Sequence, residues 1–228
     1  MEVVDLSVTG KTALNQRLHH LAHHPGEAHW RVLNPDGQHS LAVGLDAPIT
    51  VEIAGHAGYY CAGMNKQATV IVEGNVGVGV AENMMSGTVH VRGDASQAAG
   101  ATAHGGLLII DGNASARCGI SMKGINIVVK GSIGHMSAFR AQAGTLVVLG
   151  DAGDALGDSI YEARIYVRGQ VQSQGADCIA KELRDEHRAE LASLLSQAGV
   201  TGVAVDEFRR YGSARNLYSF HVDNASQY

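Results

Sequence analysis

The feature that most constrains this chain is a glycine that returns every 19 residues. Seven glycines keep this spacing without a slip: Gly55, Gly74, Gly93, Gly112, Gly131, Gly150 and Gly169. Glycine occupies 29 of 228 positions. The probability that seven chosen positions are all glycine by chance is therefore roughly 5 × 10⁻⁷, or about 10⁻³ to 10⁻⁴ when the period and phase are chosen freely. The repeat is therefore real, and a period of this length is typical of a solenoid.

The residues just before each glycine indicate a short β-strand. Positions four and two before it are aliphatic in all seven units: Val51/Ile53, Val70/Val72, Val89/Val91, Leu108/Ile110, Ile127/Val129, Leu146/Val148 and Ile165/Val167. Side chains two apart share one face of a strand, and most of these are β-branched. A 19-residue unit cannot bury such a pair alone, so successive units must stack. The pattern predicts an all-β fold, a right-handed parallel β-helix of about seven coils, roughly 30 Å long.

The residues that follow the strand indicate corners. The residue after each glycine is polar: His56, Asn75, Asp94, Asn113, Ser132, Asp151 and Gln170. We expect the glycine to adopt a positive φ there and the polar side chain to bond to nearby backbone. A second small-residue corner recurs at Ala68, Gly87, Gly106, Gly144 and Ala163, with Gly124 displaced by one.

Charges should stack beside the glycine column. The residue before the glycine reads Glu73, Arg92, Asp111 and Lys130 in four consecutive coils. Opposite charges one strand apart attract by about 0.2–1 kcal/mol per contact, whereas a one-residue slip would break the pattern. The ladder therefore supports the 19-residue register.

Two flanks lack the repeat, so we divide the chain into an N-terminal flank (1–48), a β-helix (49–176) and a C-terminal flank (177–228). Residues 12–24 predict a short helix with Thr12 as N-cap and an apolar face, and the segment 25–48 is rich in turns. That face contains Leu14, Leu18 and Leu21. Residues 177–198 predict a second helix, which Gly199 ends.

The tail 200–228 is rich in aromatic side chains. It holds five of the chain's eleven aromatic residues: Phe208, Tyr211, Tyr218, Phe220 and Tyr228. They must pack either on the rod or on a partner protein. In the second case, deleting 200–228 should leave a folded rod that no longer assembles.

Composition and charge exclude several partners. The net charge is −5 without a basic run, which argues against nucleic acid and anionic membrane surfaces. No signal segment opens the chain and no apolar run approaches the roughly 20 residues of a membrane span, so we expect a cytoplasmic protein. Cys61, Cys118 and Cys178 lie far apart without C-x-x-C spacing, which argues against disulfides and thiolate metal sites.

Two motifs suggest ligands and are better explained otherwise. The glycine run Gly74-Asn-Val-Gly77-Val-Gly79 resembles a dinucleotide fingerprint, but Glu82 stands where a third glycine is needed and no helix pattern follows. The run falls instead at a coil corner. The histidine cluster, residues 19–24, offers two i,i+4 pairs, yet it lacks an acidic or cysteine partner, which favours a solvated face or an interface over a metal site. The cluster consists of His19, His20, His23 and His24.

Carboxylates could serve a polysaccharide-cleaving β-helix. Asp94 and Asp151 share a phase three coils apart, about 14 Å, which exceeds the roughly 6.5–9.5 Å of inverting pairs. Asp111 lies in the charge ladder. Asp151, Asp154 and Asp158 form the best remaining cluster, without a row of aromatic platforms for sugar. We therefore assign no catalytic, cofactor-binding or metal-ligating residue.

These units resemble a known family. The stretches GYYCAGMNKQATVIVEGNVGVGVAENMMSGTVHVRGDA and EFRRYGSARNLYSFHVDN are similar to the glycine-repeat (GXGXG) β-helix domain of the glutamate synthase large subunit. More distantly, they resemble the β-helix subunit of formylmethanofuran dehydrogenase. The fold resemblance covers about 49–176, and with its flanks the chain looks like the free-standing β-helix subunit of N-methylglutamate synthase. Ser96, Ser115 and Gln172 depart from the motif, where the family has its second glycine.

The resemblance implies a non-catalytic scaffold in a hetero-oligomer. It would join a class II glutamine amidotransferase-like subunit to an FMN-binding glutamate synthase-like subunit, with FMN and an iron–sulfur cluster on the partner and no cofactor on this chain. The product is glutamate or N-methylglutamate, and the second, formed from glutamate and methylamine, is the leading expectation. The chain carries no Cys after Met1 to act as the amidotransferase nucleophile, and its three cysteines are too far apart to hold a cluster. The alternatives are a formylmethanofuran dehydrogenase-like subunit, an autonomous carbohydrate-active β-helix and a self-associating rod.

Overall fold

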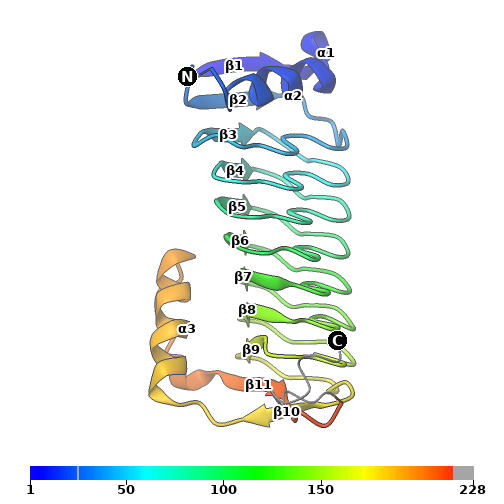
Figure 1. Cartoon of the computed structure of the whole chain (residues 1–228), viewed down its shortest axis with the longest axis vertical. Helices are drawn as coiled ribbons and strands as arrows, with labels where there is room; N and C mark the ends of the chain where they lie inside the picture. Colours follow the sequence, from blue (N-terminus) through cyan, green and yellow to red (C-terminus); the bar gives the residue numbers. More distant parts are fainter. Residues whose placement is uncertain (25, 218–228) are drawn as a thin grey trace, which may run out of the picture.

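The structure is a computed structural model that describes residues 1–24 and 26–217, and it is a single stack of coils (Figure 1). Parallel strands stack along the rod in chain order: β2 (His29–Leu33), β3 (Thr50–Ile53), β4 (Thr69–Val72), β5 (Thr88–Val91), β6 (Leu107–Ile110), β7 (Lys123–Val129), β8 (Ala143–Val148) and β9 (Arg164–Val167). Val51 pairs with Val70 and Val70 with Val89, so the 19-residue register holds. The predicted parallel β-helix is confirmed.

The core of the rod is the predicted aliphatic column. All fourteen inward side chains, two from each of seven strands, have 0% exposure. A second column of backbone bridges follows the glycine corner and joins Ala57, Val76, Ala95, Ala114, Ile133, Ala152 and Val171. Each coil is therefore tied to its neighbours on two sides, and apolar burial runs without interruption along the axis.

The corner glycines serve close packing rather than a left-handed backbone. Of the seven, only Gly55 has a positive φ, 145°, so our expectation for the others was wrong. A Cβ on Gly131 would lie 2.6 Å from the main-chain oxygen of Gly112, and one on Gly169 would lie 2.4 Å from that of Gly150. Each of the six later glycines lies against the glycine of the preceding coil, whereas Gly55 lies against Pro35, and a side chain at the six would push the coils apart. At the second corner the glycines adopt a positive φ, for example 85° at Gly87, whereas Ala68 and Ala163 do not.

The sheet extends into the N-terminal flank, beyond the part that the repeat indicates. β1 (Glu2–Asp5) pairs in parallel with β2, and β2 places the buried Trp30 and Val32 in register with Val51 and Ile53. The glycine spacing misses this coil for two reasons. The step from His29 to its partner Thr50 is 21 residues, and Asn34, with φ 53°, stands at the corner in place of glycine.

The N-terminal helix is shorter than predicted. α1 (Leu6–Thr9) precedes α2 (Lys11–His20), and the N-cap of α2 is Gly10 rather than Thr12. Leu14 and Leu18 are buried on the apolar face as predicted, and Leu21 packs partly buried against the core.

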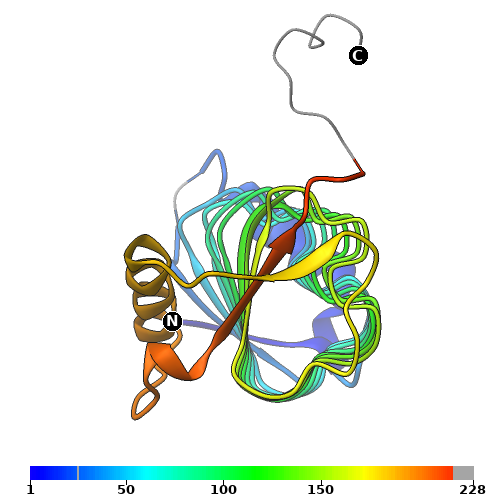
Figure 2. The same ribbon diagram turned by 90° about the horizontal axis from the view of Figure 1, so that it is seen from below.

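The C-terminal flank folds back on the rod. β10 (Cys178–Lys181) precedes α3 (Asp185–Gln197), so the helix predicted over 177–198 begins later than expected. η1 (Val205–Glu207) follows, and β11 (Arg209–Ser213) inserts antiparallel between β9 and β10. Figure 2 shows β10 and β11 lying across the end of the coils, with α3 beside them.

The aromatic tail is partly integral to the rod. Phe208 and Tyr211 are buried against it, whereas Tyr218, Phe220 and Tyr228 lie outside the described residues. Removing 200–228 would therefore remove strand β11, which pairs with β9 and β10, so the expectation that this deletion spares the rod stays a prediction to be tested. Within the described part of the chain, no helix has the length and apolar character needed to cross a bilayer.

Candidate functional site

The glycine run is a stacked corner, as its position in the repeat predicts. A Cβ on Gly77 would lie 2.6 Å from Cδ1 of Tyr59 and 2.7 Å from the main-chain carbon of Gly58. A Cβ on Gly74 would lie 2.8 Å from the Gly55 carbonyl. Gly74 and Gly77 therefore allow the preceding coil to approach closely.

The polar residues after the corner glycines form a ladder along the rod. Each backbone N–H donates to the side chain of the polar residue one coil earlier. The six bonds are Asn75 to His56 (2.8 Å), Asp94 to Asn75 (2.9 Å), Asn113 to Asp94 (2.6 Å), Ser132 to Asn113 (2.9 Å), Asp151 to Ser132 (2.9 Å) and Gln170 to Asp151 (2.7 Å). The carboxylates of Asp94 and Asp151 are therefore acceptors for the next coil.

The charge ladder is confirmed around Asp111. Its carboxylate lies 2.7 Å from Lys130 Nζ, 2.9 Å from His90 Nε2 and 3.5 Å from Arg92. Burial raises the pKa of Asp111, but the hydrogen bonds from Lys130 and His90 outweigh burial and hold that pKa below its usual value.

The first residue of the predicted ladder has a different partner. Glu73 pairs with Arg31 of β2 at 3.1 Å, and Arg31 also binds Glu52 at 2.8 Å. A long arginine side chain on the coil that the repeat missed therefore reaches Glu73.

The remaining aspartates make turn contacts. Asp154 accepts a hydrogen bond of 2.9 Å from the Ser173 hydroxyl. Asp158 accepts one of 2.7 Å from the Ser159 hydroxyl and one of 3.2 Å from the Ala176 N–H. The cluster considered for sugar chemistry is thus engaged in holding the loops of the last coils.

The histidines and cysteines make packing contacts. His19 Nε2 lies 2.6 Å from the carbonyl oxygen of Val43, and His20 stacks on His24 with ring centroids 4.1 Å apart. Residues 1–24 and 26–217 contain no group of three or more potential ligands that could hold a metal ion. All three cysteines are free and buried, and burial raises the pKa of Cys61 and Cys118 to about 12.

Sequence reasoning missed the surface on which α3 docks. At the outward-facing strand position, the three preceding coils carry Glu52, Ile71 and His90, whereas in the last four coils the residue there is apolar throughout. These residues pack under α3 and Phe208 in a second apolar cluster: Ile109, Val128, Val147, Tyr166, Leu191, Leu194, Leu195, Ala198 and Phe208. The run of four consecutive apolar residues at this position was the available signal.

Glu190 fixes α3 to the sheet through polar contacts. Its carboxylate accepts hydrogen bonds from Tyr166 (2.7 Å), Arg164 (2.7 Å) and Thr145 (3.1 Å). Burial raises the pKa of Glu190, but these donors outweigh burial and lower it overall. The carboxylate is therefore ionised at neutral pH.

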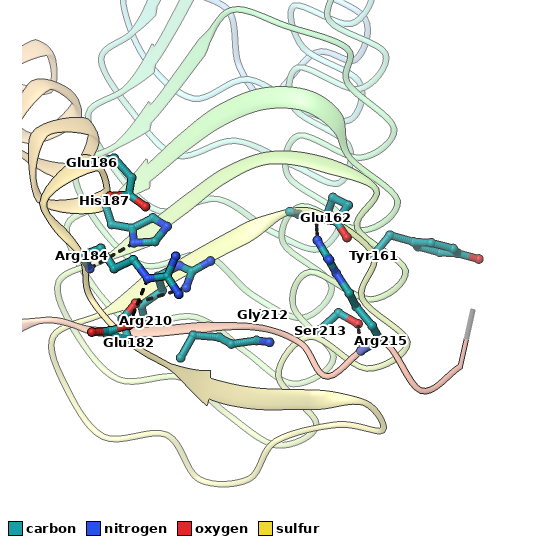
Figure 3. A pocket seen from close by; sticks show the side chains of 12 residues that line it. Tyr161, Glu162, Glu182, Arg184, Glu186, His187, Arg210, Gly212, Ser213 and Arg215 are labelled. Atoms are coloured by element: carbon teal, nitrogen blue, oxygen red, sulfur yellow. Dashed lines mark hydrogen bonds and ion pairs between the residues drawn. The ribbon is translucent and has the colours of Figure 1, made fainter. Parts of the chain in front are cut away.

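A basic cavity of about 350 Å³ lies at the C-terminal end of the rod, between β10, β11 and the start of α3. Figure 3 shows Glu182, Arg184, His187 and Arg210 gathered on one side, with Glu162 and Arg215 on the other. Its residues belong to no spaced motif, so the sequence reasoning did not find it. The density of basic residues in 181–188 and 209–215 was the only signal.

A known protein matches the chain over its full length, although no family model does. The chain is 60% identical over 228 residues to Protein GlxC of Rhizobium meliloti (strain 1021), and the match covers 100% of both proteins.

Proposed function

Because the chain belongs to the family of Protein GlxC, we propose that it is the β-helix subunit of a multisubunit glutamate synthase-like amino-acid synthase. The uninterrupted stack of glycine corners carries this proposal, since this repeat is what resembles the glutamate synthase domain. The full-length match supports a free-standing subunit.

The subunit acts as a scaffold. The carboxylates of Asp94, Asp111 and Asp151 are bound within the rod, and the glycines of the glycine run pack against the preceding coil. These carboxylates and glycines of the repeat therefore serve to stack successive coils. A rigid rod of this kind is suited to holding two catalytic subunits at a fixed separation.

The proposed partners are a class II glutamine amidotransferase-like subunit and an FMN-binding glutamate synthase-like subunit. FMN and an iron–sulfur cluster are carried by the second partner, and the complex is cytoplasmic. The reaction is the formation of N-methylglutamate from glutamate and methylamine. A role as the β-helix subunit of a formylmethanofuran dehydrogenase-like complex is the alternative, because the same repeat resembles that subunit.

Co-purification of the tagged full-length chain from its native cells tests this function. We expect a flavin-containing chain and an amidotransferase-like chain to elute with it in fixed ratio. The complex should form N-methylglutamate from glutamate and methylamine, whereas a glutamate synthase would instead consume glutamine and 2-oxoglutarate. A monodisperse chain without partners that cleaves polysaccharide would overturn the proposal.

Surface variants can test whether the flanks hold the partners. Of the eight large exposed apolar side chains in the described part of the chain, three lie in the first eight residues: Met1, Val3 and Val8. Val8 is 86% exposed, so Val8→Glu should release one partner, keep the other and leave the rod folded. Lys123→Glu, an exposed change in the middle of the rod, is the matched control and should keep both.

A further inference from the structure

We propose that the basic cavity at the C-terminal end of the rod binds a small soluble anion through its carboxylate or phosphate group. The cavity lies between β10, β11 and the first turn of α3, with a volume of about 350 Å³ (Figure 3). This site is separate from the scaffold role, and it can be tested on the isolated chain.

The cavity has an excess of positive charge. Four cationic side chains line it, against three carboxylates: Lys181, Arg184, Arg210 and Arg215 against Glu162, Glu182 and Glu186. Arg184 pairs with Glu182 at 3.0 Å, and Arg215 pairs with Glu162 at 2.9 Å. Within the described residues, Lys181 and Arg210 form no ion pair, although the Glu190 carboxylate interacts with Arg210 at longer range.

Arg210 has unused hydrogen-bonding capacity. Its Nη1 donates to the main-chain oxygen of Glu182 at 3.2 Å, and its Nε is buried without a partner. A guanidinium has five N–H donors, and a partly buried one is stabilised by an anion that accepts two of them side by side. Burial is the largest cause that lowers the pKa of Arg210; Arg164 and Arg184 lower it further, whereas Tyr166 and Glu190 act in the opposite direction without offsetting burial.

His187 and the end of α3 add neutral donors. The Arg184 N–H donates to Nδ1 of His187 at 3.1 Å, and burial lowers the pKa of this histidine. The ring is therefore neutral at pH 7 with its proton on Nε2, which makes Nε2 a donor. The N-terminal end of α3, a helix of 13 residues, also borders the cavity, with Asp185 and Glu186 in its first turn offsetting part of the positive end of the helix.

The lining favours a small polar ligand over a peptide. Besides its charged residues and His187, the cavity is lined by Tyr161, Ala163, Gly212 and Ser213. It therefore lacks the apolar anchoring pockets by which peptide segments are held. A volume of about 350 Å³ is at the lower end of small-molecule sites.

Calorimetric titration of the full-length chain tests the site, at low ionic strength because salt screens such binding. Inorganic phosphate and succinate are the probes, each titrated to about 10 mM, enough to saturate a site with a Kd near 1 mM. We expect saturable binding of at least one of them, with one anion per chain. Phosphate alone would assign the site to phosphate-bearing ligands, and succinate alone to carboxylates.

Substitutions locate the binding. Lys181→Met should weaken it at least about tenfold, and Arg210→Lys, which keeps the charge but loses the fork geometry, should weaken it similarly. Lys11→Met, at the opposite end of the chain, is the matched control and should bind as the parent does. Circular dichroism checks that each variant is folded. If Arg210→Lys is unfolded, the affinity of Lys181→Met alone tests the proposal. Absence of saturable binding, or equal binding by Lys181→Met and the parent, would overturn the proposal.

Discussion

The hydroxyl of Tyr166 donates a 2.7 Å hydrogen bond to the carboxylate of Glu190, and this contact joins strand β9 to helix α3. Arg164, on the same strand, donates to Glu190 at 2.7 Å. The same helix buries Leu191, Leu194 and Leu195 against the sheet. Glu190 thus adds polar contacts to the apolar packing and strand pairing that hold the C-terminal flank on the rod.

Glu190→Gln should loosen α3 without unfolding the coils. The amide cannot form the ion pair with Arg164, and hydrogen bonds to charged groups contribute about 1.5–3 kcal/mol each. We expect faster hydrogen exchange in 185–197 and a slightly lower free energy of unfolding. Glu186→Gln, which removes an exposed carboxylate one turn earlier, is the control. Equal exchange in the two variants would contradict the role assigned to Glu190.

Gly131→Ala should destabilise the rod far more than an alanine at a glycine with open surroundings. Its Cβ would lie 2.5 Å from Oδ1 of Asn113 and 2.6 Å from the Gly112 oxygen, so two coils must separate. Overpacking of this kind costs about 1–3 kcal/mol. The control is Gly212→Ala, whose nearest neighbour is 3.7 Å away. Urea unfolding of both variants measures the difference, and similar midpoints would refute the packing explanation.

The coils could be predicted from sequence because their energetics repeat. Every unit must bury the same aliphatic pair and stack its corner on the preceding one, so position 51 predicts positions 70 and 89. The charge ladder followed for the same reason. The physical role of the corner glycine could not be predicted from the sequence. Close contact with a neighbouring coil and a positive φ both favour glycine, so the residue type does not distinguish them.

The flanks could not be predicted because their contacts are not periodic. β11 pairs antiparallel with β9 across about 40 residues, as in Arg210 with Tyr166, and no local pattern records such a pairing. The basic cavity arises only where β10, β11 and α3 meet, so its residues are scattered in sequence. Strand β2 was missed because an asparagine replaces the marker glycine.

Asn113→Ala should remove one step of the polar ladder. Its Oδ1 accepts the Ser132 N–H at 2.9 Å, and losing such a bond costs about 0.5–1.5 kcal/mol. Gln170→Ala alters the corresponding position of the last coil, where no further coil donates to the side chain, so little change is expected there. Thermal unfolding compares the two, and a larger loss for Gln170→Ala would contradict the ladder.

Deleting 200–228 should destabilise the end of the rod, whereas deleting 218–228 should spare the described coils. The longer deletion removes β11, which pairs with β9 through Arg209, Arg210 and Tyr211, and it exposes that strand edge to other chains. We expect aggregation of the longer deletion in gel filtration and a monodisperse shorter one. A longer deletion that unfolds at the parent's temperature would show that β11 is dispensable.

Asp111→Asn should make the rod less sensitive to acid. The folded pKa of Asp111 lies below its unfolded value of about 3.9, because Lys130 and His90 bind the ionised form. As the pH falls, Asp111 therefore takes up a proton in the unfolded chain before it does so in the folded chain. Its contribution to the free energy of unfolding is complete above about pH 5 and is lost as the pH falls through 3.9 toward the folded pKa. In urea titrations, the free energy of unfolding should fall less steeply below about pH 5 in Asp111→Asn than in the parent. The variant should also be less stable than the parent at pH 7, since Lys130 loses its ion pair. Asp36→Asn, which removes an exposed carboxylate in a turn, should follow the parent curve, and an Asp111→Asn curve parallel to the parent's would show that this network does not govern acid unfolding.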